Sequence, residues 1–165
     1  MTRNGHRHIP LSIVRFVLST AVVITATATT VAPGMAQDAD WRIVGNPYQE
    51  DIEYSFGSTH TPRIEVDGVR WHSFRIETPD GALLTDGETV ETDVTLEIEN
   101  RRTKSAKILV ILLLEDENGN PLDRIEVKQF KVTGGRLKER TETASLSSEI
   151  ITSARRVYVF FEVLQ

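Results

Sequence analysis

Hydrophobic and polar residues alternate in short segments over most of the chain, and residues typical of turns separate these segments. The clearest case is 88–100, where apolar side chains recur at every second position from Val94 to Ile98. This pattern predicts a β-strand with one buried face and one face in water. The chain contains about nine such segments, which predicts an all-β fold, and their close spacing is typical of a β-sandwich.

One hairpin can be predicted together with its turn. Asp67-Gly68 stands between the β-rich segments 63–66 and 69–76. A two-residue turn of this kind needs positive φ at both positions, which Asp and Gly tolerate. Upstream of the hairpin, the alternation over 52–56 predicts a further strand.

Further along the chain, the phase of the alternation changes between Val127 and Phe130, which predicts a β-bulge at Lys128-Gln129. Residues 136–147 are mostly charged or hydroxylated. Charge on an edge strand discourages pairing with another chain, so we predict an edge strand here. Ser147 stands where it could cap a single helical turn after that strand.

Two segments, 108–114 and 157–163, differ from the others because apolar residues occupy both alternating positions, with Glu162 as the one exception. Both are short and rich in branched residues, so we interpret them as neighbouring strands with two buried faces. A small sandwich buries only one face of each sheet, and the other face would be left as an exposed apolar patch. We therefore predict that segment 41–76 packs on or extends the sheet that holds these two strands.

The N-terminal segment 1–36 differs in kind from the rest of the chain. It contains three arginines and no acidic residue, then the apolar run 16–24, and then a small-x-small sequence that ends at Ala36. A basic start, a short apolar centre and small residues before the cleavage point are typical of a secretory signal peptide. We predict cleavage after Ala36 and a periplasmic or secreted protein that keeps no stable membrane anchor.

The residues leave two alternatives to a signal peptide open. An uncleaved transmembrane anchor needs about 20 apolar residues, and here Arg15 and repeated threonines interrupt the run. An organellar transit peptide shares the acid-poor, Arg- and Thr-rich composition, but the compact apolar centre disfavours it. The chain has no cysteine, which excludes a lipoprotein anchor as well as disulfides, thiolate metal sites and cysteine nucleophiles.

The acidic charge of the chain disfavours some classes of binding partner. All 24 Asp and Glu residues follow residue 36, and the 165-residue chain has a net charge of −5. Nucleic acids and anionic lipids bind basic surfaces, so an acidic body disfavours both. We therefore predict no nucleic-acid partner and no docking on a membrane surface.

Aromatic residues concentrate in the N-terminal part of the body, where six of the ten that follow residue 36 lie between residues 41 and 74. Exposed tryptophan and tyrosine anchor protein interfaces or stack on sugars, whereas buried ones belong to a core. The sequence leaves core, protein-binding surface and glycan platform open. The candidate surface residues are Trp41, Tyr48, Tyr54 and Trp71, and the glycan platform would use Trp41, Tyr48 and Trp71.

Other motifs do not support an activity. Arg42-Ile-Val-Gly45 resembles the activation junction of trypsin-like proteases, but no Gly-Asp-Ser-Gly sequence follows it. His60 and His72 lie on the two arms of the predicted hairpin but out of register, and a metal site needs a third ligand. The acidic turn 115–118 lacks the ligand spacing of a calcium loop, and nothing selects a carboxylate pair for glycoside hydrolysis. We predict no catalytic residue, no metal, no cofactor and no enzymatic activity.

Four features of the C-terminal part occur in a fixed order: Val94-x-Leu-x-Ile-x-Asn100, the apolar run 108–114, Asp116-x-x-Gly119 and the closing strand 157–161. In this order they resemble the bacterial immunoglobulin-like sandwich domains of secreted and envelope proteins, such as cell-adhesion-related and FxLYD-type domains. The resemblance covers residues 87–164. It implies a binding or assembly role outside the cytoplasm and no catalytic residues, because those domains share none.

Together these observations predict a signal peptide over 1–36 and a single immunoglobulin-like β-sandwich domain over 37–165. Within that domain, 37–86 would hold the aromatic strands and the hairpin, and 87–165 the immunoglobulin-like core. We expect a non-catalytic exported module that binds or scaffolds another envelope or extracellular protein. A carbohydrate-binding module is the alternative and a small hydrolase is third. The sequence does not give the oligomeric state.

Overall fold

The structure is a computed structural model that describes residues 41–79 and 87–164. These residues lie within one unit of the chain, Met35–Gln165. The predicted signal peptide, residues 1–36, lies outside the described residues. The described part is all-β, as predicted, with nine strands in two sheets and one short helix. Within it, no helix has the length and apolarity that a membrane span requires.

The five-stranded sheet has the order β1-β3-β4-β5-β8. β1 runs parallel to β3, and the other neighbouring strands are antiparallel. β8 is one of the two edge strands of this sheet, which confirms the prediction for 136–147. The strands are β1 (Arg42–Val44), β3 (Ile64–Val66), β4 (Val69–Glu77), β5 (Thr89–Asn100) and β8 (Arg136–Ser147).

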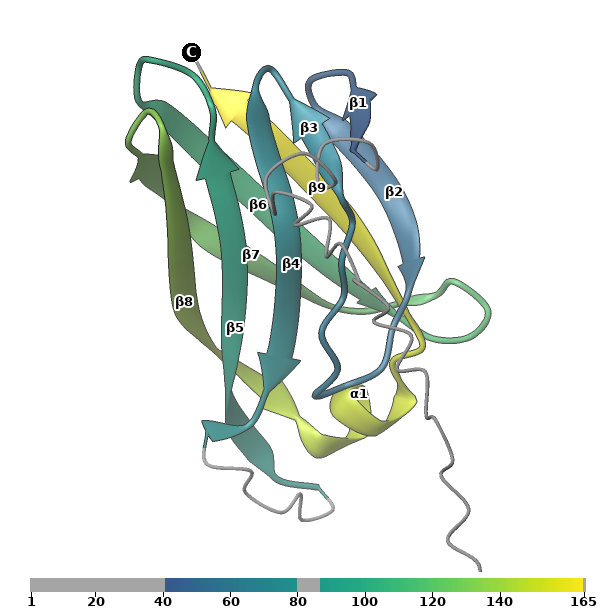
Figure 1. Cartoon of the computed structure of the whole chain (residues 1–165). Helices are drawn as coiled ribbons and strands as arrows, with labels where there is room; N and C mark the ends of the chain where they lie inside the picture. Colours follow the sequence, from purple (N-terminus) through teal and green to yellow (C-terminus); the bar gives the residue numbers. More distant parts are fainter. Residues whose placement is uncertain (1–40, 80–86, 165) are drawn as a thin grey trace, which may run out of the picture. The chain divides into compact units, whose positions relative to one another are not determined.

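The four-stranded sheet has the order β2-β9-β6-β7 and is antiparallel throughout. Figure 1 shows β9, β6 and β7 as a layer behind β4, β5 and β8. β6 and β9, the two strands that are apolar at both alternating positions, are direct neighbours, as predicted. The strands are β2 (Tyr48–Glu53), β6 (Ala106–Glu115), β7 (Pro121–Val132) and β9 (Arg156–Leu164).

One hydrophobic core lies between the two sheets. Trp71 and Phe74 of β4 and Phe161 of β9 are among its largest fully buried side chains. Trp71 stacks on Phe161 across the core, with ring centroids 5.3 Å apart. Within segment 41–76, β4 packs on the inner face of the four-stranded sheet and β2 extends that sheet, but the segment does not cover the outer face, which was the reason for the prediction.

Three local predictions are confirmed. Asp67 and Gly68 have positive φ of 47° and 75° between β3 and β4, as a two-residue hairpin turn requires. In β7, Lys128-Gln129 stand opposite the single residue Leu109 of β6, which is the predicted bulge. The helix α1 (Ser148–Ser153) begins after the predicted cap, Ser147.

The strand predicted at 52–56 lies instead at Tyr48–Glu53 and ends before Tyr54. The cause is a tertiary contact of Asn46. Its side-chain amide donates a hydrogen bond to the carbonyl oxygen of Val163 at 2.8 Å, and the N–H of Val163 donates to the amide oxygen of Asn46 at 3.1 Å. These two bonds fix the start of β2 beside β9, and strand pairing overrides the local alternation.

The prediction that β6 and β9 are buried on both faces was wrong. The inward residues of β6, from Ile108 to Leu114, are fully buried, whereas the outward residues from Leu109 to Leu113 are only partly buried. β9 shows the same alternation. The physical reason is that β3 and β4, which were expected to cover an outer face, joined the five-stranded sheet instead.

Candidate functional site

The four aromatic residues predicted as a candidate surface do not form one. Tyr48, Tyr54 and Trp71 are 7%, 4% and 0% exposed, and Trp41 is partly buried. A glycan platform made of Trp41, Tyr48 and Trp71 needs a row of exposed rings, which this burial contradicts. For Tyr48, Tyr54 and Trp71 the structure supports the alternative interpretation, that they belong to the core.

Trp41 is engaged by residues of β4. The guanidinium of Arg70 lies 4.8 Å from the centroid of the Trp41 ring, and the imidazole of His72 meets this ring edge-on at 4.6 Å. His72 Nε2 in turn lies 3.3 Å from a carboxylate oxygen of Glu99. A cation over an indole stabilises a partly exposed site by about 0.5–1 kcal/mol. Trp41 therefore has a structural role at the start of β1.

Tyr48 belongs to a polar cluster that the sequence did not predict. Arg42 Nη2 donates hydrogen bonds to the Glu50 carboxylate at 2.6 Å and to the Tyr48 hydroxyl at 2.9 Å, and that hydroxyl also donates to Glu50. The hydrogen bond from Arg42 lowers the pKa of Glu50, and burial raises the pKa of Tyr48 to about 12. At neutral pH the cluster is an ion pair with a neutral phenol, which ties β1 to β2.

Tyr54 lies in a stack of rings. The His60 ring lies between Tyr54 and Phe74, with centroid distances of 5.3 Å and 5.0 Å. The Tyr54 hydroxyl has no hydrogen-bond partner among the described residues, and burial raises its pKa. His60 contacts the rings of Tyr54 and Phe74, whereas His72 contacts Trp41 and Glu99. In residues 41–79 and 87–164, no group of three or more His, Asp or Glu side chains could hold a metal ion.

The acidic turn between β6 and β7 is held by Asp116. Its carboxylate accepts hydrogen bonds from the N–H groups of Asn118 and Asn120 at 2.8 Å and 2.9 Å, and from the side-chain amide of Asn120 at 2.8 Å. These bonds, that of the Asn120 side chain first, lower the pKa of Asp116. The carboxylate oxygens are thus used by the turn itself, which supports the interpretation of this segment as a structural turn.

The outer face of the four-stranded sheet carries a group of partly exposed apolar side chains on the neighbouring strands β6 and β9. Ile111 pairs with Phe160 and Leu113 pairs with Tyr158 across β6 and β9. These side chains point away from the core and are neither fully buried nor fully exposed. We call this group the apolar stripe; it comprises Leu109, Ile111, Leu113, Tyr158, Phe160 and Leu164, and it is interrupted on β9 by Glu162, the cross-strand neighbour of Leu109.

Charged residues flank the apolar stripe, and the two flanks differ in sign. On β2 the exposed residues Asp51 and Glu53 form an acidic margin. On β7 the exposed residues Arg124 and Lys131 form a basic margin, interrupted by the exposed Glu126, whereas Lys128 at the bulge pairs with Glu142 of β8 at 3.3 Å. An apolar strip thus runs between margins of opposite charge.

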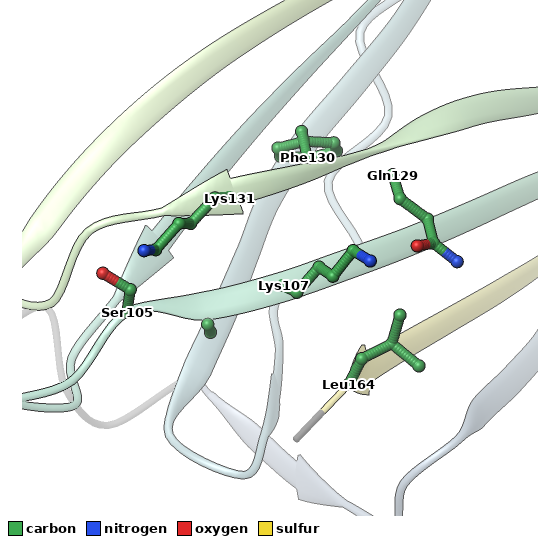
Figure 2. A pocket seen from close by; sticks show the side chains of 7 residues that line it. Ser105, Lys107, Gln129, Phe130, Lys131 and Leu164 are labelled. Atoms are coloured by element: carbon green, nitrogen blue, oxygen red, sulfur yellow. The ribbon is translucent and has the colours of Figure 1, made fainter.

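The apolar stripe ends at an open pocket of about 400 Å³. Figure 2 shows Lys107 of β6, Gln129 of β7 and Leu164 of β9 around it, with Lys131 and Ser105 at its other side. Leu164 gives the pocket an apolar wall, and the two lysines give it positive charge. The pocket is therefore continuous with both the apolar stripe and the basic margin.

This arrangement has features in common with protein interfaces. Interfaces bury an apolar centre inside a polar rim, and aromatic side chains such as Tyr158 and Phe160 are enriched at their centres. The sequence did carry the signal for this face, because 108–114 and 157–163 are apolar at both alternating positions. That signal was interpreted as complete burial within the chain.

No family model matches the chain. No curated protein matches it either. Among solved structures, the enzymatically active domain of tailspike protein 4 from bacteriophage CBA120 is similar to it at 13% identity, with a TM-score of 0.23. The similarity covers 72% of this chain but only 17% of the tailspike chain. A likeness this weak carries no argument about fold or activity.

Proposed function

We propose that this protein is a non-catalytic exported module that binds another protein, with the apolar stripe as its binding face. The observation that carries the proposal is the partial exposure of outward apolar residues on two neighbouring strands, β6 and β9. Contiguous apolar patches rimmed by polar residues mark interaction sites on soluble proteins. Burial of the rings of Tyr158 and Phe160 by a partner would supply the anchors of such an interface.

The order of the strands supports an immunoglobulin-like fold as part of this proposal. Immunoglobulin domains have strands A, B and E side by side in one sheet and G, F, C and C′ in the other. The orders β4-β5-β8 and β2-β9-β6-β7 match these. One difference is that β2, in the G position, comes from the N-terminal part of the chain.

Export is supported by the sequence of segment 1–36. If it is a signal peptide, the intact mass of the protein isolated from the periplasm or the medium corresponds to a chain that begins at Gln37. Recovery of the full-length chain from the cytoplasm would contradict this part of the proposal.

Site-specific photo-cross-linking in the producing cells tests the binding face. A photoreactive amino acid at Phe160 is expected to cross-link a protein, because that side chain lies at the centre of the apolar stripe. The matched control is Leu137 of β8, an apolar residue that is 55% exposed on the other sheet. The proposal fails if position 160 yields no protein cross-link, or if position 137 yields the same products.

Carbohydrate binding has no such support. Three of its four candidate aromatic residues, Tyr48, Tyr54 and Trp71, are buried. Trp41 is partly covered by Arg70 and His72. Nothing in the described residues therefore favours a glycan over a protein.

A further inference from the structure

We propose that the partner of the apolar stripe is a second copy of this chain, bound face to face about a two-fold axis. This inference rests on the proposed function, because it assigns the partner of the same face. It follows from the order of charges across the four-stranded sheet and from the size of its outer face.

Two cross-strand rows form the apolar centre of the face, between rows that include Glu162 on one side and Arg156 with Glu115 on the other. Strand register aligns Asp51 of β2, Tyr158 of β9, Leu113 of β6 and Arg124 of β7 in one row. The adjacent row contains Gln49, Phe160, Ile111 and Glu126 in the same strand order. In both rows two apolar residues lie in the middle, and the two end residues can pair with each other.

A two-fold axis that runs along the strands, between β9 and β6, makes these rows self-complementary. In a symmetric dimer, if one residue contacts another, the same pair forms again across the axis. β9 then packs on β6 of the second copy, and β2 on its β7. The carboxylate of Asp51 meets the guanidinium of Arg124 in the second copy, and Gln49 meets Glu126.

Other symmetric arrangements lack this match. An axis across the strands would put β2 against β2, so that Asp51 and Glu53 would meet the same carboxylates, and like charges in contact disfavour association. Within one copy Asp51 and Arg124, the two residues proposed to meet, form only exposed pairs, Asp51 with Arg156 at 3.0 Å and Arg124 with Glu126 at 3.2 Å. Exposed pairs contribute about 0–1 kcal/mol, so exchanging them for contacts across the dimer costs little.

The size of the face suits a dimer. β9, one of the two central strands, has nine residues. With about 3.4 Å per residue and about 4.8 Å between strands, a face of four such strands covers roughly 600 Å². Two copies would bury about 1,200 Å² in total, which reaches the lower limit of stable, specific interfaces.

Sedimentation of the purified protein over a range of concentrations tests the inference directly. We expect a monomer–dimer equilibrium that Phe160→Glu shifts to monomer, because the substitution introduces a charge at the apolar centre. The control, Leu137→Glu, adds the same charge to an exposed apolar position of the other sheet and should leave the dimer unchanged. Near-ultraviolet circular dichroism of each variant checks that the fold is intact. A protein that is monomeric at every concentration overturns the inference, and so does a dimer that survives Phe160→Glu.

Charge exchange tests the symmetry. Asp51→Arg and Arg124→Asp should each weaken the dimer about tenfold or more, the loss expected for one close charge pair. The double variant D51R/R124D restores opposite charges across the axis and should recover the wild-type Kd within about twofold. Glu91→Arg, an equal charge change at an exposed position of β5, is the control. A double variant that dimerises no better than the single variants overturns the proposed two-fold arrangement.

The cross-linking experiment separates this inference from the proposed function. A product from position 160 with twice the mass of the chain supports the dimer. A product with a different protein, together with a monomeric sedimentation pattern, overturns the dimer and leaves the proposed function standing. No protein product from position 160 overturns both.

Discussion

β6 and β9 carry apolar side chains on both faces of the four-stranded sheet, but the two faces are buried to different degrees. Inward residues such as Leu112 and Phe161 are fully buried, whereas outward neighbours such as Leu113 and Phe160 are partly exposed. The residue types are the same, so apolarity alone does not explain the difference. The inner face is covered by the five-stranded sheet, which shows that burial depends on which strands join which sheet.

The strongest test of this comparison removes the cover of the inner face. A fragment of residues 83–165 lacks β1 to β4, and with them Trp71 and Phe74 of the core. Of the five-stranded sheet only β5 and β8 then remain to cover the inner face, and we expect an aggregating or molten fragment without a cooperative transition. Near-ultraviolet circular dichroism and gel filtration check this. A monomeric fragment that melts as sharply as the longer chain would show that β1 to β4 are not needed to cover the core.

Adjacent residues of β9 give a matched comparison of the two faces. Phe161→Ala should destabilise the protein by about 3–5 kcal/mol, because it leaves a cavity beside Trp71 in a packed core. Phe160→Ala removes the same atoms from the partly exposed face, and we expect a loss below about 1 kcal/mol for the monomer. Urea unfolding at a protein concentration too low for self-association measures both. Equal losses would mean that the outer face is packed as tightly as the inner one.

The elements that the sequence predicted correctly depend on residues close together in the chain. The Asp67-Gly68 turn, the bulge at Lys128-Gln129 and the cap at Ser147 each follow from neighbouring side chains and backbone preferences. The partly exposed face was mispredicted because alternation marks a position as apolar but not which strand will cover it. Which face is covered depends on tertiary pairing, because β3 and β4 join β5 in the five-stranded sheet.

The candidate site was predicted even less completely. Trp71, Tyr54 and Tyr48 were candidates because of their residue type, yet interior aromatics and interface aromatics look the same in a sequence. The cluster of Arg42, Tyr48 and Glu50 had no sequence signal, because it joins strands of two different sheets. Such contacts depend on the assembled layers.

A smaller difference in stability is expected between two variants that each remove one tyrosine hydroxyl, one buried and one on the outer face. Tyr54→Phe removes a buried hydroxyl with no hydrogen-bond partner in the described residues, so the protein should gain up to about 1 kcal/mol of stability. Tyr158→Phe is the control, because its hydroxyl lies on the outer face and donates to Gln49 at 2.5 Å. We expect that change to be neutral or slightly destabilising. Thermal unfolding compares the two, and a loss of stability in Tyr54→Phe would indicate that its hydroxyl is satisfied.

The smallest expected effect is on the stability of the protein at acidic pH. Folding lowers the pKa of Glu50 below its ordinary value of 4.5, so its carboxylate stabilises the folded state above about pH 4.5, and this contribution is lost as the pH falls further. Glu50→Gln should therefore flatten the decline of stability in acid, by less than about 1 kcal/mol because the Arg42 pair is partly exposed. Glu53→Gln removes a charge from the outward side of the same strand as a control. Urea unfolding between pH 3 and pH 7 measures the difference, and parallel curves for wild type and Glu50→Gln would contradict it.

The contact between Asn46 and Val163 joins residues 117 positions apart in the chain. At about 5–20 residues per second, synthesis separates the appearance of these two residues by roughly 6–23 s. Throughout that interval β2 has no strand to pair with, and β6, once it is made, lacks its neighbouring strand β9. A route that keeps the polypeptide unfolded until its last strand has been made therefore suits this topology better than folding in stages as the chain emerges.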